Sequence, residues 1–189
     1  MKPLTIYLIL LFFSCSAEGQ VNTDYGSGPQ YLNHIYYYRG DSLVELQQTS
    51  GKMVSKTKAM GYGGSEGGLL VQGEKSSVRI KGGDSVRFAI KTGMSMMMDP
   101  SMMIRLYKFS PKKGDREAVL SSEGGMYNRD KSTTNAAEIP FNIQKGTDDY
   151  IIIPASRLAP GEYGFMNLMM VNGAGSRNMS YAVFVFGVD

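Results

Sequence analysis

The chain has 189 residues, of which 42% are hydrophobic and 20% charged, and its net charge is +3. These values suit one globular domain with a real core and exclude a chain that is disordered throughout. The basic residues are scattered, so nucleic acid is not an expected partner. The single cysteine, Cys15, and the single histidine, His34, exclude a zinc centre built from these residue types. Ser-His-Asp or Cys-His catalysis would depend entirely on His34.

The N-terminal residues predict export from the cytoplasm. Residues 1–19 contain Lys2, then an apolar run over Leu4–Phe13, then small residues. The run has about half of the roughly 20 residues that cross a bilayer, so it predicts a signal peptide rather than a membrane span. We therefore expect a periplasmic, extracellular or outer-membrane-anchored protein.

The signal peptide can be cleaved in two ways, and both stay open. Cys15 follows Phe12-Phe13-Ser14, which is similar to a bacterial lipobox, although leucine is usual where Phe12 stands. Acylated Cys15 would then anchor the protein to a membrane. Ordinary cleavage after Ala17 or Gly19 would release it. Residues 20–31 are polar and without periodicity and predict a flexible leader, followed by one domain over residues 32–189.

The first half of this domain predicts two hairpins. Strands over 35–38 and 42–46 flank the turn Arg39-Gly40-Asp41. Strands over 77–80 and 85–90 flank Lys81-Gly82-Gly83-Asp84. Because the two turns share their Gly-Asp-Ser chemistry, we interpret Arg39-Gly40-Asp41 as a turn and not as an adhesion motif. The glycine-rich residues 61–68 lead into a strand rather than a helix, which favours a loop over a phosphate-binding site.

The second half also predicts strands. Residues 103–109 alternate, with Met103, Arg105, Tyr107 and Phe109 on one face and Ile104, Leu106 and Lys108 on the other. Further strands are expected over 116–121, 141–143, 150–153, 161–171 and 180–188. About ten short strands separated by turn residues predict an all-β fold. We expect a β-sandwich with immunoglobulin-like or jelly-roll topology.

Methionine is the most unusual feature of the composition. The chain has 14 methionines, and six of them lie within Met94–Met103. Strand alternation places Met94, Met96 and Met98 on one face. Three interpretations stay open: packing of an irregular core, an exposed apolar surface for a partner or for self-association, and a Cu(I) site held by the thioethers of these three residues. No other cofactor is expected.

Carboxylates offer a weaker, enzymatic hypothesis. Glu117, Glu123, Asp130 and Glu138 lie in or beside residues 115–138. Hydrolysis of a glycoside needs two carboxyl groups that face each other across a cleft, which a sequence cannot establish. The chain also has no tryptophan to form a carbohydrate platform. We therefore expect no enzymatic activity.

Several segments together resemble a family of exported bacterial β-sandwich proteins, mostly from Bacteroidetes, whose function is not established. They are residues 36–38 with 43–46, 56–64, 73–79, 99–106, 158–165 and 186–189. The resemblance implies an exported β-sandwich and brings no activity, cofactor or site residue. Turns similar to Leu158-Ala159-Pro160-Gly161-Glu162-Tyr163 occur in extracellular β-sandwiches, where the tyrosine bonds the backbone. We expect this of Tyr163 and expect Glu162 to face solvent beside Arg157.

The sequence thus predicts an exported, non-enzymatic binding module of the cell envelope, whose partner is an unknown envelope protein or ligand. A membrane would be contacted only through a lipid on Cys15. The alternative is a periplasmic binder of Cu(I) or another soft metal through the cluster Met94–Met103.

Overall fold

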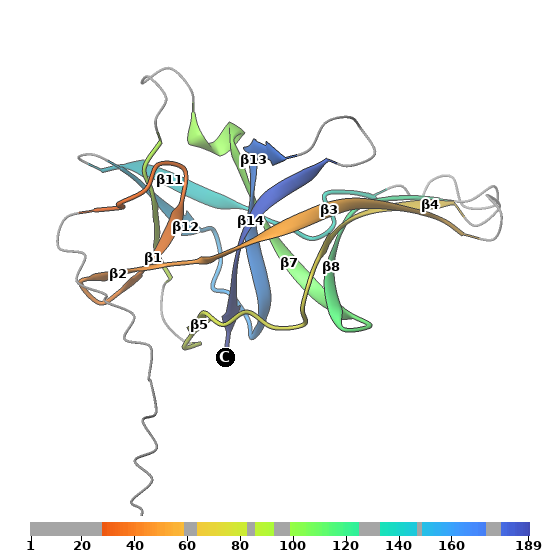
Figure 1. Cartoon of the computed structure of the whole chain (residues 1–189), viewed down its shortest axis with the longest axis horizontal. Helices are drawn as coiled ribbons and strands as arrows, with labels where there is room; N and C mark the ends of the chain where they lie inside the picture. Colours follow the sequence, from red (N-terminus) through yellow and green to blue (C-terminus); the bar gives the residue numbers. More distant parts are fainter. Residues whose placement is uncertain are drawn as a thin grey trace, which may run out of the picture.

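The protein folds almost entirely into β-strands (Figure 1). The structure, a computed structural model, describes residues 28–58, 64–82, 86–92, 99–124, 133–146, 149–172 and 179–189. Strands hold 66% of these residues, and the described part of the chain contains no α-helix. The 3₁₀ turn within the described ranges is η2 (Pro100–Met102), which lies just before β7.

A smaller sheet has five strands in the order β11-β12-β6-β1-β2. All of its neighbouring strands pair antiparallel. Its members are β1 (Ile35–Arg39), β2 (Ser42–Glu45), β6 (Phe88–Ile90), β11 (Phe141–Lys145) and β12 (Tyr150–Pro154).

A larger sheet has nine strands, and β14 with its two long neighbours lies at its centre. Its path is β10 (Glu138–Ile139), β7 (Ile104–Lys112), β13 (Gly161–Asn172), β14 (Ser180–Val188), β3 (Gln47–Thr57), β4 (Ser65–Val71), β8 (Asp115–Glu123) and β9 (Thr133–Thr134). The short strand β5 (Arg79–Ile80) pairs parallel to the end of β14.

The larger sheet closes on itself, so the predicted sandwich of about ten strands is wrong. β7 pairs with β8 from Ser110↔Glu117 to Lys112↔Asp115, which completes a ring through β7, β13, β14, β3, β4 and β8. The result is a six-stranded β-barrel in a fold of 14 strands. Alternating residues give the same signal in a sandwich and in a barrel, because in both each strand has one face in a core. Closure depends on which strands pair, which local patterns do not encode.

Residues that alternate along the barrel strands point to opposite faces and pack into two different cores. One core fills the barrel and is built from Leu69, Val71, Tyr107, Phe109, Ala118, Met166, Val183 and Val185. Glycines make room there, since a Cβ on Gly164 would lie 2.9 Å from Phe109 and 3.0 Å from Val183. The alternation predicted over residues 103–109 is confirmed for Tyr107 and Phe109, which face the inside. It is wrong for Met103, which precedes β7 and packs in the other core with Ile104 and Leu106.

The second core lies between the barrel wall and the five-stranded sheet. The barrel contributes the outward residues of β7, β13 and β14, including Leu106, Phe165 and Phe184. The five-stranded sheet contributes Ile35 and Phe88 among others. Rings meet here edge to face, as between Phe88 and Phe165, whose centroids are 4.9 Å apart. Both faces of these barrel strands are therefore buried.

One predicted hairpin is confirmed and the other is wrong. β1 and β2 pair down to Arg39↔Ser42, and Gly40 in the turn has φ of 62°. The strands on either side of Lys81-Gly82-Gly83-Asp84 do not pair with each other. β5 joins β14 in the larger sheet, whereas β6 joins β1 and β12 in the smaller one. Residues 83–85 lie outside the described residues.

Candidate binding surface at one end of the barrel

The predicted metal ligands and the lipidation site lie outside the described residues. This holds for Met94, Met96 and Met98, for Cys15 and for the whole predicted signal peptide. Two methionines of the same cluster are described. Met102 is 66% exposed, whereas Met103 is buried in the core between barrel and sheet. Within the cluster Met94–Met103, the described thioether that faces solvent is therefore that of Met102.

Four of the described methionines are exposed, and the elements that carry or adjoin them, η2, the end of β13, the start of β14 and β3, come together in the upper part of Figure 1. Met102 lies on η2, Met169 on β13, and Met53 on β3. Ser180 on β14 pairs with Lys52 on β3. Met179 and Met53 are the next residues beyond this pair on their two segments, which places them opposite each other. Their exposures run from 38% to 66%. We call Met53, Met102, Met169 and Met179 the methionine surface.

The strand β13 becomes irregular where Met169 leaves the ladder. The register with β14 shifts between Asn167 and Val171, as in a β-bulge. The buried Asn167 fixes this bend, because its Oδ1 accepts a hydrogen bond from the backbone N–H of Met169 at 2.9 Å. The bend leaves the thioether of Met169 exposed instead of continuing the alternation.

The 3₁₀ turn is fixed to the same strand. Asp99 caps η2, since its Oδ1 accepts the N–H of Ser101 at 2.8 Å. Met103 follows the turn directly, and its carbonyl oxygen accepts a hydrogen bond from the backbone N–H of Leu168 on β13 at 2.8 Å. Arg105 folds back on the turn and donates to the carbonyl oxygens of Ser101 and Ile104. Met102 is therefore presented by an anchored backbone.

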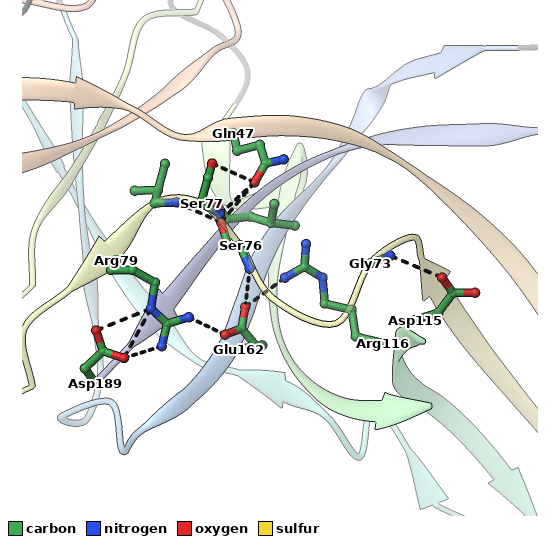
Figure 2. Close-up of polar contacts among 11 residues, drawn as sticks. Gln47, Gly73, Ser76, Ser77, Arg79, Asp115, Arg116, Glu162 and Asp189 are labelled. Atoms are coloured by element: carbon green, nitrogen blue, oxygen red, sulfur yellow. Dashed lines mark hydrogen bonds and ion pairs between the residues drawn. The ribbon is translucent and has the colours of Figure 1, made fainter. Parts of the chain in front are cut away.

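Charged residues are in contact with one another near the other end of the barrel, where β8 and β13 begin (Figure 2). Arg116 is 1% exposed, and its Nη1 donates to Oε2 of Glu162 at 2.8 Å. Glu162 also accepts from Arg79 and, at 2.8 Å, from the N–H of Ser76. Arg79 in turn is held by Asp189. Two cations and two anions thus form one chain of contacts.

The environment of this network shifts several pKa values. Burial lowers the pKa of Arg116, and the nearby Glu162 carboxylate offsets this only in part. Hydrogen bonding to Asp189 is the main cause that raises the pKa of Arg79. The predicted position of Glu162, facing solvent beside Arg157, is wrong because Glu162 points toward Arg116 and Arg79. The predicted backbone bond of Tyr163 is confirmed, since its hydroxyl donates to the carbonyl oxygen of Ala159 at 2.7 Å.

A second group of charges lies on the outer wall of the barrel. The Glu117 carboxylate accepts from Nζ of Lys56 at 2.8 Å and from Nζ of Lys112. Burial raises the pKa of Glu117, but the hydrogen bonds from Lys112 and Lys56 outweigh it, and the net pKa lies below its ordinary value. The two lysines and the glutamate connect β3, β8 and β7.

The carboxylates considered for hydrolysis have separate partners. Glu117 lies between the two lysines, Glu123 accepts from Oγ of Ser65 at 3.0 Å, and Glu138 lies 3.3 Å from Nε of Arg105. Asp130 lies outside the described residues. His34, the one histidine, contacts Glu45 at 2.6 Å and lies between the rings of Tyr31 and Phe184. No single cleft collects these groups in the described part of the chain.

In the described ranges, no group of three or more His, Cys, Asp and Glu side chains could hold a metal ion. No helix in the same ranges has the length and apolarity needed to cross a membrane.

Sequence reasoning located part of these sites. It singled out the cluster Met94–Met103 but not Met53 or Met179, which are far apart in sequence and lie side by side only through the pairing of β3 with β14. It also missed the charged network, because Arg79, Arg116 and Glu162 come from β5, β8 and β13. A weak signal for Met169 was available in the adjacent pair Met169-Met170, which breaks strict alternation.

Comparisons of the chain with protein-family models, with curated proteins and with solved structures found no match. The resemblance to the exported proteins of Bacteroidetes therefore stays a prediction.

Proposed function

We propose that this protein is an exported, non-enzymatic binding module of the cell envelope, and that it binds a partner protein through the methionine surface. The observation that carries the proposal is the exposure of four described methionines, Met53, Met102, Met169 and Met179, on or beside elements that come together in the upper part of Figure 1. Monomeric proteins keep such apolar side chains scattered, and clusters of them mark interaction sites. Methionine suits this role because its flexible, polarizable side chain adapts to a partner's shape.

The rest of the molecule supports a binding role for the methionine surface. Arg116, Glu162 and Arg79 are in contact with one another near the end of the barrel where β8 and β13 begin. The barrel interior is filled by side chains. The backbone beneath Met102 and Met169 is held by hydrogen bonds. A fixed backbone that carries adaptable side chains lowers the entropic cost of binding. The expected partner presents an apolar patch and comes from the same envelope.

Photo-crosslinking tests the proposal in the expressing bacterium. A benzophenone side chain at position 102 or 169 should yield one adduct of defined mass, whereas the same group at the exposed Lys113 should yield none. The adduct formed from position 102 should disappear when Met53, Met169 and Met179 are changed to glutamine. It should persist when the exposed Lys75, Lys113 and Glu123 are changed to glutamine instead. An adduct of twice the chain mass would assign the surface to self-association and overturn the partner proposal, as would the absence of any adduct.

The second candidate function is binding of Cu(I) or another soft metal, which the presence of several thioethers at one end favours. The ligands would then include Met102 together with the predicted Met94, Met96 and Met98. Native mass spectrometry with Ag(I) tests this alternative. Retention of one silver ion that is lost in the M94Q/M96Q/M98Q variant supports it, and retention of none contradicts it.

A further inference from the structure

A pocket of about 370 Å³ lies between the end of β1 and the short strand β5, away from the methionine surface. Its walls are Tyr37 and Tyr38 with Arg39 from the first hairpin, and Arg79 with Lys81 from the region of β5. The volume falls within the range of small-ligand sites and exceeds the space of one inorganic anion. The pocket was not part of any site predicted from the sequence, although Arg39 and Gly40 belong to the motif interpreted as a turn.

The charge of the pocket is positive. Three of its lining residues are cationic, Arg39, Arg79 and Lys81, and none of its described lining residues is acidic. Arg79 is already neutralised, because Glu162 and Asp189 hold its guanidinium (Figure 2). Arg39 and Lys81 are exposed, and neither side chain has a hydrogen-bond or ion-pair partner among the described residues. Among the described residues, no acidic side chain compensates these two charges.

The backbone holds the two sides of the pocket in place. Arg39 pairs with Ser42 at the end of the β1–β2 hairpin and lies on the same face of β1 as the buried Tyr37. Lys81 follows β5, which is bonded to β14 and whose Ile80 is buried in the core between barrel and sheet. Arg79 adds a guanidinium whose orientation is already fixed by its two carboxylate partners. The backbone on both sides is therefore in place before an anion arrives, and the ordering that remains is that of the Arg39 and Lys81 side chains.

Aromatic groups complete the wall beside the cations. Tyr37 is 6% exposed, and no hydrogen bond of its hydroxyl occurs among the described residues. Tyr38 lies under the guanidinium of Arg87, whose carbon is 5.2 Å from the ring centroid. Arg87 itself is not among the residues that line the pocket. Because Tyr38 lies on the opposite face of β1 from Tyr37 and Arg39, the phenol beside the two cations is that of Tyr37.

We propose that this pocket binds a phosphate group carried by a small polar molecule or by a lipid headgroup. Arg39 and Lys81 would donate charge-assisted hydrogen bonds to the phosphate oxygens, and Arg79 would add a fixed donor. The tyrosine side would receive the part of the ligand that bears the phosphate. This site goes beyond the proposed partner binding and does not depend on it, since it lies on different strands and uses charge instead of apolar area.

Calorimetric titration of the full chain with sodium pyrophosphate tests the proposal. We expect saturable binding that weakens as salt is added. In the R39Q/K81Q variant the affinity should fall by at least about tenfold, because two charge-assisted hydrogen bonds are lost. The K52Q/K113Q variant removes the same charge from exposed lysines elsewhere and should keep the affinity of the wild type within about twofold. Thermal melts of both variants establish that they fold.

Vesicles distinguish the two sources of the phosphate. Binding to vesicles of phosphatidylglycerol but not of phosphatidylcholine, with release by pyrophosphate and loss in R39Q/K81Q, assigns the site to a lipid headgroup. Binding of pyrophosphate without binding to either vesicle assigns it to a soluble ligand. The proposal is overturned if pyrophosphate gives no saturable heat, or if the K52Q/K113Q variant loses affinity as strongly as R39Q/K81Q.

Discussion

At the scale of single residues, the most informative group is Arg116 with Glu162. Arg116 is almost wholly buried, and its Nε has no hydrogen-bond partner among the described atoms. Glu162, in contrast, has three donors, from Arg116, Arg79 and Ser76. Removal of one partner from a buried ion pair costs more than replacement of both, because a lone charge stays in a poorly solvated place. The two residues should therefore respond unequally to substitution.

We expect Glu162→Gln to lower the free energy of unfolding by about 3 kcal/mol, because Arg116 loses its counter-charge while buried. Arg116→Met should cost less, about 1 kcal/mol, since an apolar side chain suits the barrel interior and Glu162 keeps its other two donors. Urea unfolding of both variants measures the difference, with the exposed Glu123→Gln as a control. A larger loss for Arg116→Met than for Glu162→Gln would contradict this account of the network.

At the scale of elements, the outer wall of the barrel is connected by the contacts of Glu117. Its carboxylate contacts Lys56 on β3 and Lys112 on β7, and it lies on β8, next to the point where β7 and β8 close the ring. The net pKa of Glu117 is below its ordinary value of 4.5 in the folded protein. A carboxyl whose pKa is lower when folded stabilises the fold above its unfolded pKa.

This contribution should disappear in acid. We expect Glu117→Gln to lower the free energy of unfolding by about 1 kcal/mol at neutral pH. The difference in the free energy of unfolding between the wild type and the variant should shrink as the pH falls below about 4.5 and through the lower pKa of the folded state. The wild-type carboxyl is then protonated and, like the glutamine amide, carries no charge. Unfolding in urea at a series of pH values between 7 and 3 measures this difference. The explanation fails if the difference stays constant over the whole range.

At the scale of the whole molecule, local patterns in the sequence predicted the strands better than their arrangement. The β1–β2 hairpin and the alternation of Tyr107 and Phe109 depend on neighbouring residues, and both were predicted correctly. β7 and β8 form a local hairpin, but the closure of the barrel also depends on β4 meeting β8, on β13 meeting β7 and on β3 meeting β14, which are contacts between distant segments. The same reason explains why Met53 and Met179 were not associated with Met102. The position of Glu162 was missed because its cations lie 46 and 83 residues away.

The central claim is that the methionine surface is covered by a partner in the cell. Oxidative footprinting of methionine in intact bacteria and on the purified protein measures this directly, since thioether oxidation follows exposure. We expect Met53, Met102, Met169 and Met179 to be oxidised readily in the purified protein and to be protected severalfold in cells. The buried Met103 and Met166 should stay unreactive in both samples and provide the internal control. Equal oxidation of the four exposed methionines in cells and in the purified protein would contradict the claim.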